Sequence, residues 1–430
     1  MNKITIIGAG LAGCEAAWQL AERGYKVVLA EMRPSTMTPA HKGGELAELV
    51  CSNSLGALNP DSPGGLLKGE LQILGSLVIQ CALMSRVPAG GALAVDRVRF
   101  SRLVTEKISS HPGITLCRER WTDFPPAPGI IATGPLTDAA LAQAIRAKLG
   151  EEMLFFYDAA SPIVDADTID RGKVFAGSRY GKGGEDYLNC PMNYEEYQRF
   201  FNALVEAETV VLKDFEEEYF EHCLPVEELA RRGPKTLTFG PLKPVGLTDP
   251  RTGSRPHAVV QLRREDVPGS LYNLVGFQTN LTWGEQKRVF RLIPGLERAE
   301  FVRYGVMHRN TYVNGPKVLD KNFRLKQFPG LYIAGQLAGV EGYVESTASG
   351  LIAALDLWSQ LEGRSADFPP ETLMGCLSAY VTRPNPDFQP MNANFGLLPP
   401  VEGKSKKERR HNYAKRSLEK MKVFAKNFNN

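Results

Sequence analysis

Three glycines and one acidic residue near the N-terminus have the types and the spacing that bind a dinucleotide. In Gly8-x-Gly10-x-x-Gly13, the first glycine permits a tight turn, the second lets the backbone approach a pyrophosphate, and the third lets helix and strand pack closely. The pyrophosphate would lie at the helix N-terminus, where free N–H groups favour anions. Glu31 is placed to accept hydrogen bonds from an adenosine ribose. The same turn predicts cofactor contacts from Ala9, Leu11 and Ala12.

The carboxylate of Glu31 also limits which dinucleotide the site takes. A negative charge at the ribose repels a 2′-phosphate, so the site suits FAD or NAD and not NADP. FAD is favoured because a short apolar run ends in Ala132, Thr133 and Gly134. This sequence matches the turn that two-lobed flavoproteins use as the chain returns to the cofactor domain.

A second glycine-rich turn, beginning at Gly335, supports the same prediction. We expect a helix to start near Ser346 and Thr347, where its N-terminus would face the flavin pyrimidine and stabilise negative charge on the reduced ring. Gln336 stands where many flavoproteins have an aspartate, which leaves the ribityl contact open. The alternative for Gly335 is an ordinary turn between a strand and a helix.

The cysteines predict neither a disulfide framework nor a zinc site. Their number is odd and no two form a C-x-x-C pair, which fits a reducing cytosol. We therefore expect no metal. The seven positions are Cys14, Cys51, Cys81, Cys117, Cys190, Cys223 and Cys376.

The elements that must position these residues follow from the hydrophobic pattern. Residues 3–31 predict a strand, a turn, a helix and a second strand, which is a βαβ unit. Residues 36–97 predict loops that form a site, with one helix over 66–84. Further expected elements are strands at 128–134, 258–263, 271–279 and 331–335, and helices at 194–208, 212–222 and 346–361.

This order predicts an α/β protein with a Rossmann-like, two-dinucleotide-binding flavoprotein fold and a mixed α+β insertion domain. We expect residues 1–154 and 301–400 to form a discontinuous FAD-binding domain, 155–300 the insertion domain, and 401–430 a basic C-terminal tail. A chain of 430 residues is long enough for two or three such lobes.

Charge and hydropathy point to a cytoplasmic protein with a polyanion as a possible partner. No apolar run approaches the roughly 18 residues of a membrane helix, and the N-terminus lacks the apolar region of a signal peptide. Residues 401–430 hold ten Lys or Arg and three Glu, a net of +7, so the first 400 residues carry −4 of the total +3. Such a tail is either an electrostatic footprint for a polyanion or a solvated surface helix.

Several phrases resemble the folate- and FAD-dependent tRNA (uracil-5-)-methyltransferases, which are small relatives of the GidA flavoproteins. They cover nearly the whole chain. The matching segments are residues 8–17, 31–34, 37–41, 49–55, 87–97, 157–162, 187–192, 223–229, 305–312 and 339–345.

The resemblance implies transfer of a methylene from 5,10-methylenetetrahydrofolate to C5 of the T-loop uridine, position 54, of tRNA. Reduced FAD would supply the electrons that complete the methyl group, and NAD(P)H would recharge the flavin. The choice between NADH and NADPH, the oligomeric state and the way the uridine is exposed are left open.

The resemblance also assigns residues. Cys223 is taken as the nucleophile at uracil C6 and Cys51 as the base that removes the C5 proton, with the reverse assignment open. We expect the folate to contact His308, Arg309, Asn310 and Tyr343, with Trp283 as a similar candidate. Further implied cofactor contacts are Arg33, Ser52, Asn53 and Ser54, and implied tRNA phosphate contacts are Arg231, Arg232 and residues 404–426.

Four alternatives remain at this point. One is a GidA-like enzyme acting on the wobble uridine, which the short chain and the phrase at 223–229 disfavour. The others are the same chemistry on ribosomal RNA, an NAD(P)H-dependent flavin oxidoreductase with an incidental basic tail, and a non-catalytic flavin-bound RNA-binding protein.

Overall fold

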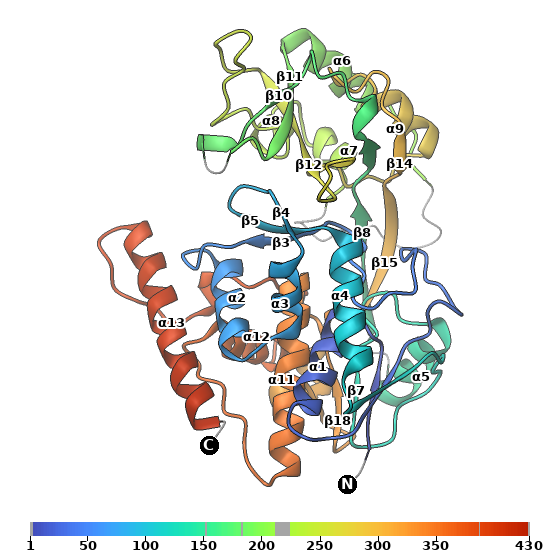
Figure 1. Ribbon diagram of the computed structural model, residues 1–430, viewed down its shortest axis with the longest axis vertical. Coiled ribbons are helices and arrows are strands. Elements are labelled where there is room, and N and C mark those ends of the chain that lie inside the picture. Colours follow the sequence, from blue (N-terminus) through green and yellow to red (C-terminus); the bar gives the residue numbers. More distant parts are fainter. Residues whose placement is uncertain (1–2, 151–152, 182–183, 211–223, 387, 429–430) are drawn as a thin grey trace.

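A seven-stranded sheet forms the centre of the lower lobe in Figure 1. The computed structural model describes residues 3–150, 153–181, 184–210, 224–386 and 388–428. Five neighbouring strands of this sheet are parallel, and the last two at one edge are antiparallel. In spatial order the strands are β16 (Leu319–Asp320), β17 (Arg324–Leu325), β18 (Leu331–Ile333), β7 (Gly129–Ile131), β1 (Ile4–Ile7), β2 (Val27–Ala30) and β6 (Ile114–Cys117).

The predicted βαβ unit is confirmed. The strand β1 is a short β-branched run whose four residues are all buried, as expected for a strand covered on both faces. It leads into helix α1 (Leu11–Ala21) and then β2, which pairs with β1 in parallel. The return of the chain at β18 places residues 331–333 beside β7, so both ends of the chain build one sheet.

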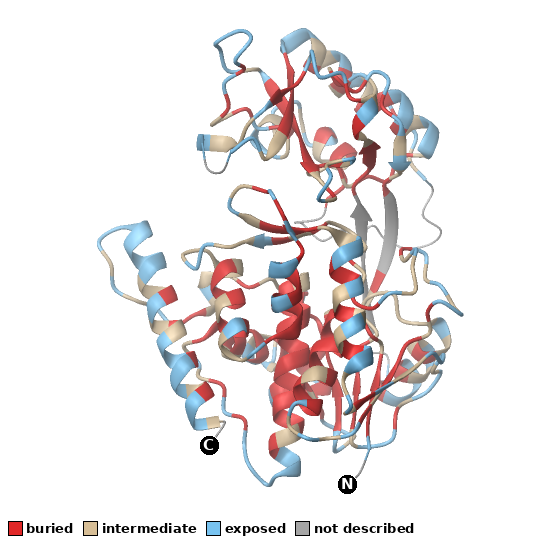
Figure 2. Ribbon diagram, in the orientation of Figure 1, coloured by how far each residue is buried: buried red, intermediate tan, exposed pale blue. Residues whose placement is uncertain are grey.

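Helix α11 (Tyr343–Leu361) packs closely against α1 on one face of this sheet. A Cβ on Gly350 would lie 2.2 Å from the Ala12 carbonyl oxygen, so glycine is what allows the two helices to approach. Figure 2 shows that buried residues concentrate in these helices and in the parallel strands. The same layer contains α4 (Arg97–Ser110), and α5 (Ala139–Leu149), α10 (Gly315–Val318) and α12 (Leu373–Thr382) complete the lobe.

The single helix predicted over 66–84 is wrong. The structure has two helices, α2 (Pro63–Ile73) and α3 (Leu77–Met84), bent by 112°. Gly75 adopts φ +72° between them, and Ser76 caps α3 by accepting the Ile79 N–H at 3.2 Å. The apolar periodicity continues through the break because both helices face the same core. A small sheet of β3 (Ser54–Ala57), β5 (Ala92–Val95) and β4 (Arg86–Val87) lies within the region predicted as loops.

The upper lobe has its own sheet and its own core. Its helices are α6 (Tyr194–Val205), α7 (Val226–Arg231), α8 (Thr236–Phe239) and α9 (Trp283–Phe290). The predicted strand at 271–279 ends at 274, because the chain turns at Gly276 with φ +77°. The helix predicted at 212–222 lies outside the described residues. The sheet order is β10 (Phe175–Ala176), β11 (Tyr187–Met192), β12 (Ala258–Arg264), β13 (Leu271–Leu274), β9 (Ile163–Asp165) and β14 (Phe301–Arg303).

Two long strands connect the lobes. They are β8 (Met153–Ala160) and β15 (Val306–Val313), which pair in antiparallel register and run between the lobes in Figure 1. Among the described residues, no single helix is long and apolar enough to cross a membrane. Only the bent pair α2 and α3, taken together, has the length and the composition of a membrane span.

The basic C-terminal segment forms a docked helix, α13 (Lys406–Phe428), on the outside of α2. Its inner face buries Ala414, Ser417, Met421 and Ala425. Its Phe424 ring lies 4.7 Å from the Phe368 ring, measured between centroids. The helix therefore has a packed face and a charged, exposed face.

Candidate functional site

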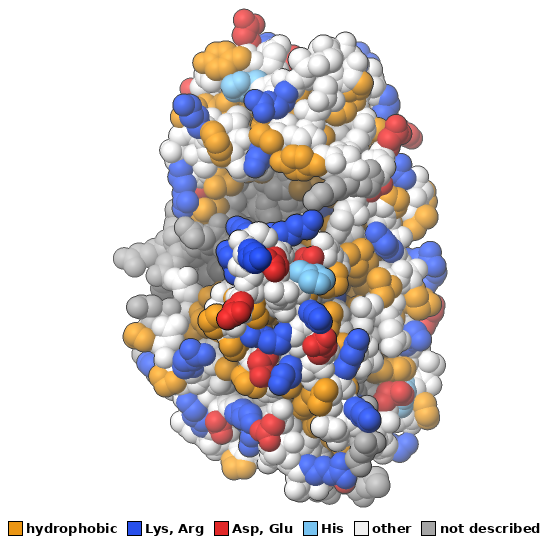
Figure 3. Space-filling view, turned by 90° about the vertical axis from the view of Figure 1, so that its left-hand side faces the viewer, with side chains coloured by type: hydrophobic (Ala, Val, Ile, Leu, Met, Phe, Trp, Pro, Cys, Tyr) orange, Lys and Arg blue, Asp and Glu red, His pale blue; other side chains and the backbone are white. Residues whose placement is uncertain are grey.

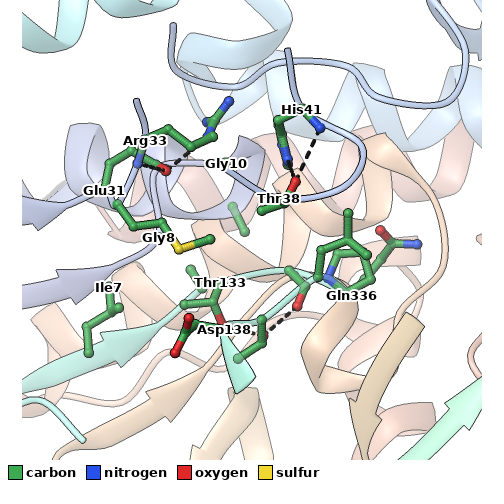
Figure 4. Close-up of a pocket in the computed structure, with 18 of the residues that line it drawn as sticks. Ile7, Gly8, Gly10, Glu31, Arg33, Thr38, His41, Thr133, Asp138 and Gln336 are labelled. Atoms are coloured by element: carbon green, nitrogen blue, oxygen red, sulfur yellow. Dashed lines mark hydrogen bonds and ion pairs between the residues drawn. The ribbon is translucent and has the colours of Figure 1, made fainter. Parts of the chain in front are cut away.

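A cavity of about 980 Å³ opens at the carboxyl ends of β1, β2 and β7. Ligands of parallel α/β sheets bind at this edge. Figure 4 shows the glycine turn after β1 in the middle of its wall. The predicted cofactor residues that line it are Gly8, Gly10, Leu11, Ala12, Glu31, Arg33, Ala132, Thr133, Gly134, Gly335, Gln336 and Ser346.

Glycine occupies each of the three positions of the turn for a different structural reason. Gly8 adopts φ +95°, and a Cβ there would lie 2.6 Å from the Ala132 carbonyl oxygen. A Cβ on Gly13 would lie 1.8 Å from the Gly8 carbonyl oxygen. A Cβ on Gly10 would meet no protein atom within 4 Å, and its φ of −75° suits any residue. Neither packing nor backbone conformation requires glycine at position 10, so the space beside it fits a ligand.

The N-terminus of α1 is ready to bind an anion. Gly10 is its N-cap and provides no side-chain cap, and the first turn contains no acidic residue. The N–H groups of this turn therefore lack a capping side chain at the cavity wall. These features fit the pyrophosphate of a dinucleotide.

Glu31 stays ionised within the cavity wall. Its Oε2 accepts the Ala9 N–H at 3.0 Å, and its Oε1 accepts the backbone N–H and the Nε–H of Arg33 at 3.0 and 2.9 Å. Burial opposes ionisation, but the Arg33 guanidinium and these hydrogen bonds outweigh it and hold the pKa of Glu31 below its ordinary value. A carboxylate has about four acceptor positions, so one remains for a ribose hydroxyl.

The structure adds cavity residues that were not assigned from the sequence. Thr38 and His41 share a hydrogen bond of 2.5 Å on the loop above the glycine turn, as Figure 4 shows. They lie in the segment 37–41, for which the family resemblance implies no residue role. Glu48, Trp121 and Asp138 also line the cavity, and no spacing in the sequence connects them to β1.

The expected helix start near Ser346 and Thr347 is wrong by three residues. Gly342, with φ +111°, is the N-cap of α11, and the Ser346 N–H already donates to the Gly342 carbonyl at 2.9 Å. The free N–H groups thus belong to the turn that begins with Tyr343. Ser346 still lines the cavity, whereas Thr347 is fully buried with its hydroxyl donating to the Tyr343 carbonyl at 2.8 Å. Gln336 donates to both oxygens of Glu341, at 3.0 and 2.9 Å.

Several predicted cofactor residues do not line the cavity. Ala9 and Gly13 are part of the turn but contribute backbone hydrogen bonding and packing. The Ser52 hydroxyl accepts from Arg263 Nη2 at 2.8 Å, and the Asn53 amide oxygen accepts from Arg263 Nε at 2.8 Å. Ser54 accepts the Gly56 N–H. This stretch joins the lower lobe to β12 of the upper lobe instead of facing the dinucleotide cavity.

Tyr343 connects the Cys51 loop to the cavity. The Tyr343 hydroxyl accepts the Cys51 N–H at 2.8 Å and the Ser52 N–H at 3.2 Å, and Tyr343 lines the cavity. Burial and the neighbouring Cys51 raise the pKa of the Tyr343 hydroxyl, so the hydroxyl remains protonated at neutral pH. The Tyr343 side chain therefore connects Cys51 to the dinucleotide cavity.

Three arginines surround the Cys51 loop. Arg97 donates to the carbonyl oxygens of Leu49 and Cys51, at 2.6 and 3.1 Å, and pairs with Glu265 at 2.5 Å. Arg303 donates to the carbonyl of the residue before Cys51. Arg97, Arg263 and Arg303 each interact electrostatically with Cys51. Three guanidinium groups against the one carboxylate of Glu265 favour an anion at this place.

The remaining predicted residues are only partly covered by the structure. Cys223 lies outside the described residues. His308 and Arg309 are on β15, where the backbone pairs with β8, and their side chains lie outside what is described. Asn310 on the same strand is buried, with 3% of its surface exposed. Among the described residues, no group of three His, Cys, Asp or Glu could hold a metal ion.

Comparison with known proteins agrees with this architecture. The family model of glucose inhibited division protein A matches residues 3–365. A structure of Aquifex aeolicus GidA superposes with a TM-score of 0.71 over 98% of this chain and 74% of the GidA chain, at 15% identity. The predicted flavoprotein fold is therefore confirmed at the level of architecture.

Two relatives match from end to end. A Heliobacterium modesticaldum protein named methylenetetrahydrofolate--tRNA-(uracil-5-)-methyltransferase TrmFO is 58% identical over 427 residues, which cover 98% of this chain and 97% of the relative. The protein of the same name from Anoxybacillus flavithermus is 56% identical and covers 99% of each chain. The chain thus belongs to the glucose inhibited division protein A family and, within it, to the methylenetetrahydrofolate--tRNA-(uracil-5-)-methyltransferases.

Proposed function

We propose that this protein is a cytoplasmic enzyme that methylates C5 of the T-loop uridine, position 54, of tRNA, with 5,10-methylenetetrahydrofolate as donor and FAD as reductant. The names of the relatives support the donor, the tRNA and the position on the base. The observation that carries the proposal is the Cys51 loop, which Tyr343 links to the dinucleotide cavity among three arginines. A thiol beside a redox cofactor is what a reductive methylation of uracil requires.

The cavity fits FAD through residues of this chain. The N-terminus of α1 and Gly10 would hold the pyrophosphate, and the remaining acceptor position on Glu31 would take the adenosine ribose. The turn from Gly335 to Tyr343 would border the flavin end. When bound and reduced, FAD would supply the electron pair that converts the methylene into a methyl group, and NAD(P)H would reduce the flavin again.

The cysteines would activate and deprotonate the uracil. C5 of uracil is a weak nucleophile, so a thiolate first adds to C6 and makes C5 electron-rich. C5 then forms a bond to the methylene carbon of the folate. A base removes the C5 proton as the carbon–nitrogen bond to the folate breaks, so tetrahydrofolate leaves and an exocyclic methylene remains on C5. This methylene takes up a hydride to become the methyl group, and the thiolate leaves C6. We assign the nucleophile to Cys223 and the base to Cys51; the reverse assignment uses the same steps.

The environment of Cys51 supports this assignment. A base at C5 must be a thiolate before it takes the proton, and thiolates form beside cationic side chains. Arg97, Arg263 and Arg303 provide that surrounding. The folate would lie along β15, where His308 and Arg309 offer a ring for the pterin and a cation for the glutamate tail, with Asn310 as a buried amide beside them.

The test is methyl transfer by purified protein with unmodified tRNA transcript, labelled methylenetetrahydrofolate, and NADPH or NADH. Labelled 5-methyluridine at position 54 is expected, and both Cys51→Ala and Cys223→Ala should abolish it. Cys117→Ala is a matched control, because Cys117 is also half-buried but lies at the end of β6. Nicotinamide oxidation without label in tRNA would overturn the proposal, and label only in a ribosomal RNA fragment run in parallel would change the substrate.

A further inference from the structure

Trp283 is an unusually exposed tryptophan. It is the first residue of α9, and 64% of its surface is accessible to solvent. Tryptophan is a large apolar ring that proteins generally cover. It does not line the dinucleotide cavity, and its contact with the folate stays a prediction.

One face of this ring is fixed by other aromatic rings. Trp283 stacks on Tyr304 with centroids 5.4 Å apart and planes 12° apart, and Tyr304 stacks on Phe301 at 5.4 Å and 18°. Phe301 in turn contacts Phe290, which is completely buried. The column therefore extends from the core of the upper lobe to the surface and ends in the open face of Trp283.

Hydrogen bonds hold the outer end of the column in place. Gln286 of α9 donates to the Gly305 carbonyl at 2.9 Å and accepts the Gly305 N–H at 2.7 Å. Gly305 directly follows Tyr304, so α9 and the strand connection are locked together. A ring positioned in this way loses little conformational entropy when a partner stacks on it.

Hydrogen bonds join the outer end of the column to the described residues that flank 211–223 and to the Cys51 loop. The Val210 N–H donates to the Asn280 carbonyl at 2.9 Å, and the Val226 N–H donates to the Gln278 carbonyl at 2.7 Å. Both flanks of the segment that contains Cys223 are thus anchored just before Trp283. On the other side, Arg303 precedes Tyr304 and donates to the backbone beside Cys51.

From this geometry we infer that Trp283 is a stacking platform for an unpaired nucleobase of the RNA substrate. Bases outside a duplex are recognised by stacking on aromatic rings, and any base offers a π face for this contact. Glu285, the carboxylate of the same helix turn, is paired with Arg288 through bonds of 2.8 and 2.5 Å, so it is not an unpaired negative charge beside the ring. Lys287 is exposed on the same helix. The inference rests on the proposed function for the choice of tRNA.

The experiment measures binding and not turnover. Unmodified tRNA transcript is titrated into the full-length protein, and the dissociation constant is determined for Trp283→Leu and Trp283→Phe. Loss of one base stack should weaken binding about 5- to 150-fold in Trp283→Leu, and Trp283→Phe should retain most of the affinity. Tyr194→Ala is the matched control, because Tyr194 also begins a helix and is 62% exposed, but packs edge-on against His257.

A second arm identifies the base. T-arm hairpins with an abasic site at each unpaired position in turn should include one that binds weakly to the wild type and is insensitive to Trp283→Leu. The wild type should also show quenching of tryptophan emission by tRNA that is absent in Trp283→Phe.

Three outcomes would overturn the inference. They are equal affinities for Trp283→Leu and Tyr194→Ala in folded proteins, emission of Trp283 that tRNA leaves unchanged, and a self-association that Trp283→Leu abolishes, which would mean that a second copy covers the ring. RNA binding through Trp283 without methyl transfer would instead contradict the proposed function alone.

Discussion

At the scale of single residues, Gly10 has a role in ligand binding and Gly13 has a role in folding. They belong to the same turn, but a Cβ on Gly10 meets no protein atom within 4 Å, whereas one on Gly13 would lie 1.8 Å from a carbonyl oxygen. The first glycine leaves room for a cofactor and the second leaves room for the protein itself.

Gly10→Ala is therefore expected to fold with an unfolding temperature close to that of the wild type and to be purified without flavin. Gly13→Ala should lose stability, because helix α1 must move away from the turn after β1. Flavin absorbance at purification and thermal unfolding of both variants check this. If Gly10→Ala kept its full flavin content, the space beside Gly10 would not be the pyrophosphate site.

Tyr343 acts through its hydroxyl on the Cys51 loop. In Tyr343→Phe the N–H groups of Cys51 and Ser52 lose their acceptor. An unsatisfied buried N–H costs about 1–3 kcal/mol, so the loop should open more often. We expect faster hydrogen exchange in residues 49–55 and methyl transfer reduced by about 10- to 100-fold.

Tyr332→Phe is the control for that experiment. Its hydroxyl is also buried, but it donates to Asp356 at 2.8 Å, away from Cys51. Equal exchange of residues 49–55 in the two variants would show that Tyr343 does not hold the loop.

At the scale of elements, Glu70 joins three helices. It lies on α2 and accepts the N–H groups of Leu373 and Met374, at 2.8 Å each, at the start of α12. The Ser417 hydroxyl of α13 donates to it as well. Burial raises the pKa of Glu70 from 4.5 to about 7, although these hydrogen bonds favour the charged form.

This shift makes the stability depend on pH in a definite direction. Between pH 4.5 and about 7 the folded protein keeps a proton on Glu70 that the unfolded chain has lost. The protonated Glu70 carboxyl therefore makes its full contribution to the free energy of unfolding below pH 4.5. This contribution is lost as the pH rises to 7, and the change is about 3 kcal/mol. Glu70→Gln cannot titrate, so wild-type stability should fall relative to this variant from pH 5 to pH 8. Parallel unfolding temperatures over that range would contradict the assignment.

At the scale of the whole molecule, the basic residues of α13 face outward beside the space between the lobes. The hydrophobic face of α13 is packed, and Lys406, Lys407 and Arg410 are exposed on its other side. Figure 3 shows this side of the molecule, hollowed between the lobes, with Lys and Arg side chains along the lower rim of the hollow. Contact of tRNA phosphates with this surface stays a prediction from the sequence.

Neutralising two of these charges should weaken tRNA binding without loosening the helix. In the double variant Lys406→Gln and Lys407→Gln, we expect the slope of log affinity against log salt to fall by about 1.5. The same change at Arg146 and Lys148 of α5, on the opposite side in Figure 1, should leave the slope unchanged. Equal slopes for both double variants would place the RNA elsewhere.

The features that could be predicted from the sequence are those that depend on short stretches of chain. The turn at Gly8, the strand and helix around it, and Glu31 all lie within 31 residues. Their spacing reflects local geometry, since strands and helices have fixed periods and a tight turn joins them over few residues. The long apolar pattern gave the correct class of fold, and the shared phrases gave the family.

The contacts between segments that are distant in the sequence could not be predicted in this way. Tyr343 reaches Cys51 across 292 positions, and Arg263 reaches Ser52 across 211. The break at Gly75 and the start of α11 at Tyr343 were also beyond the pattern, because apolar residues continue through both boundaries. Such contacts depend on how the whole chain packs, and many different packings satisfy the same local periodicity.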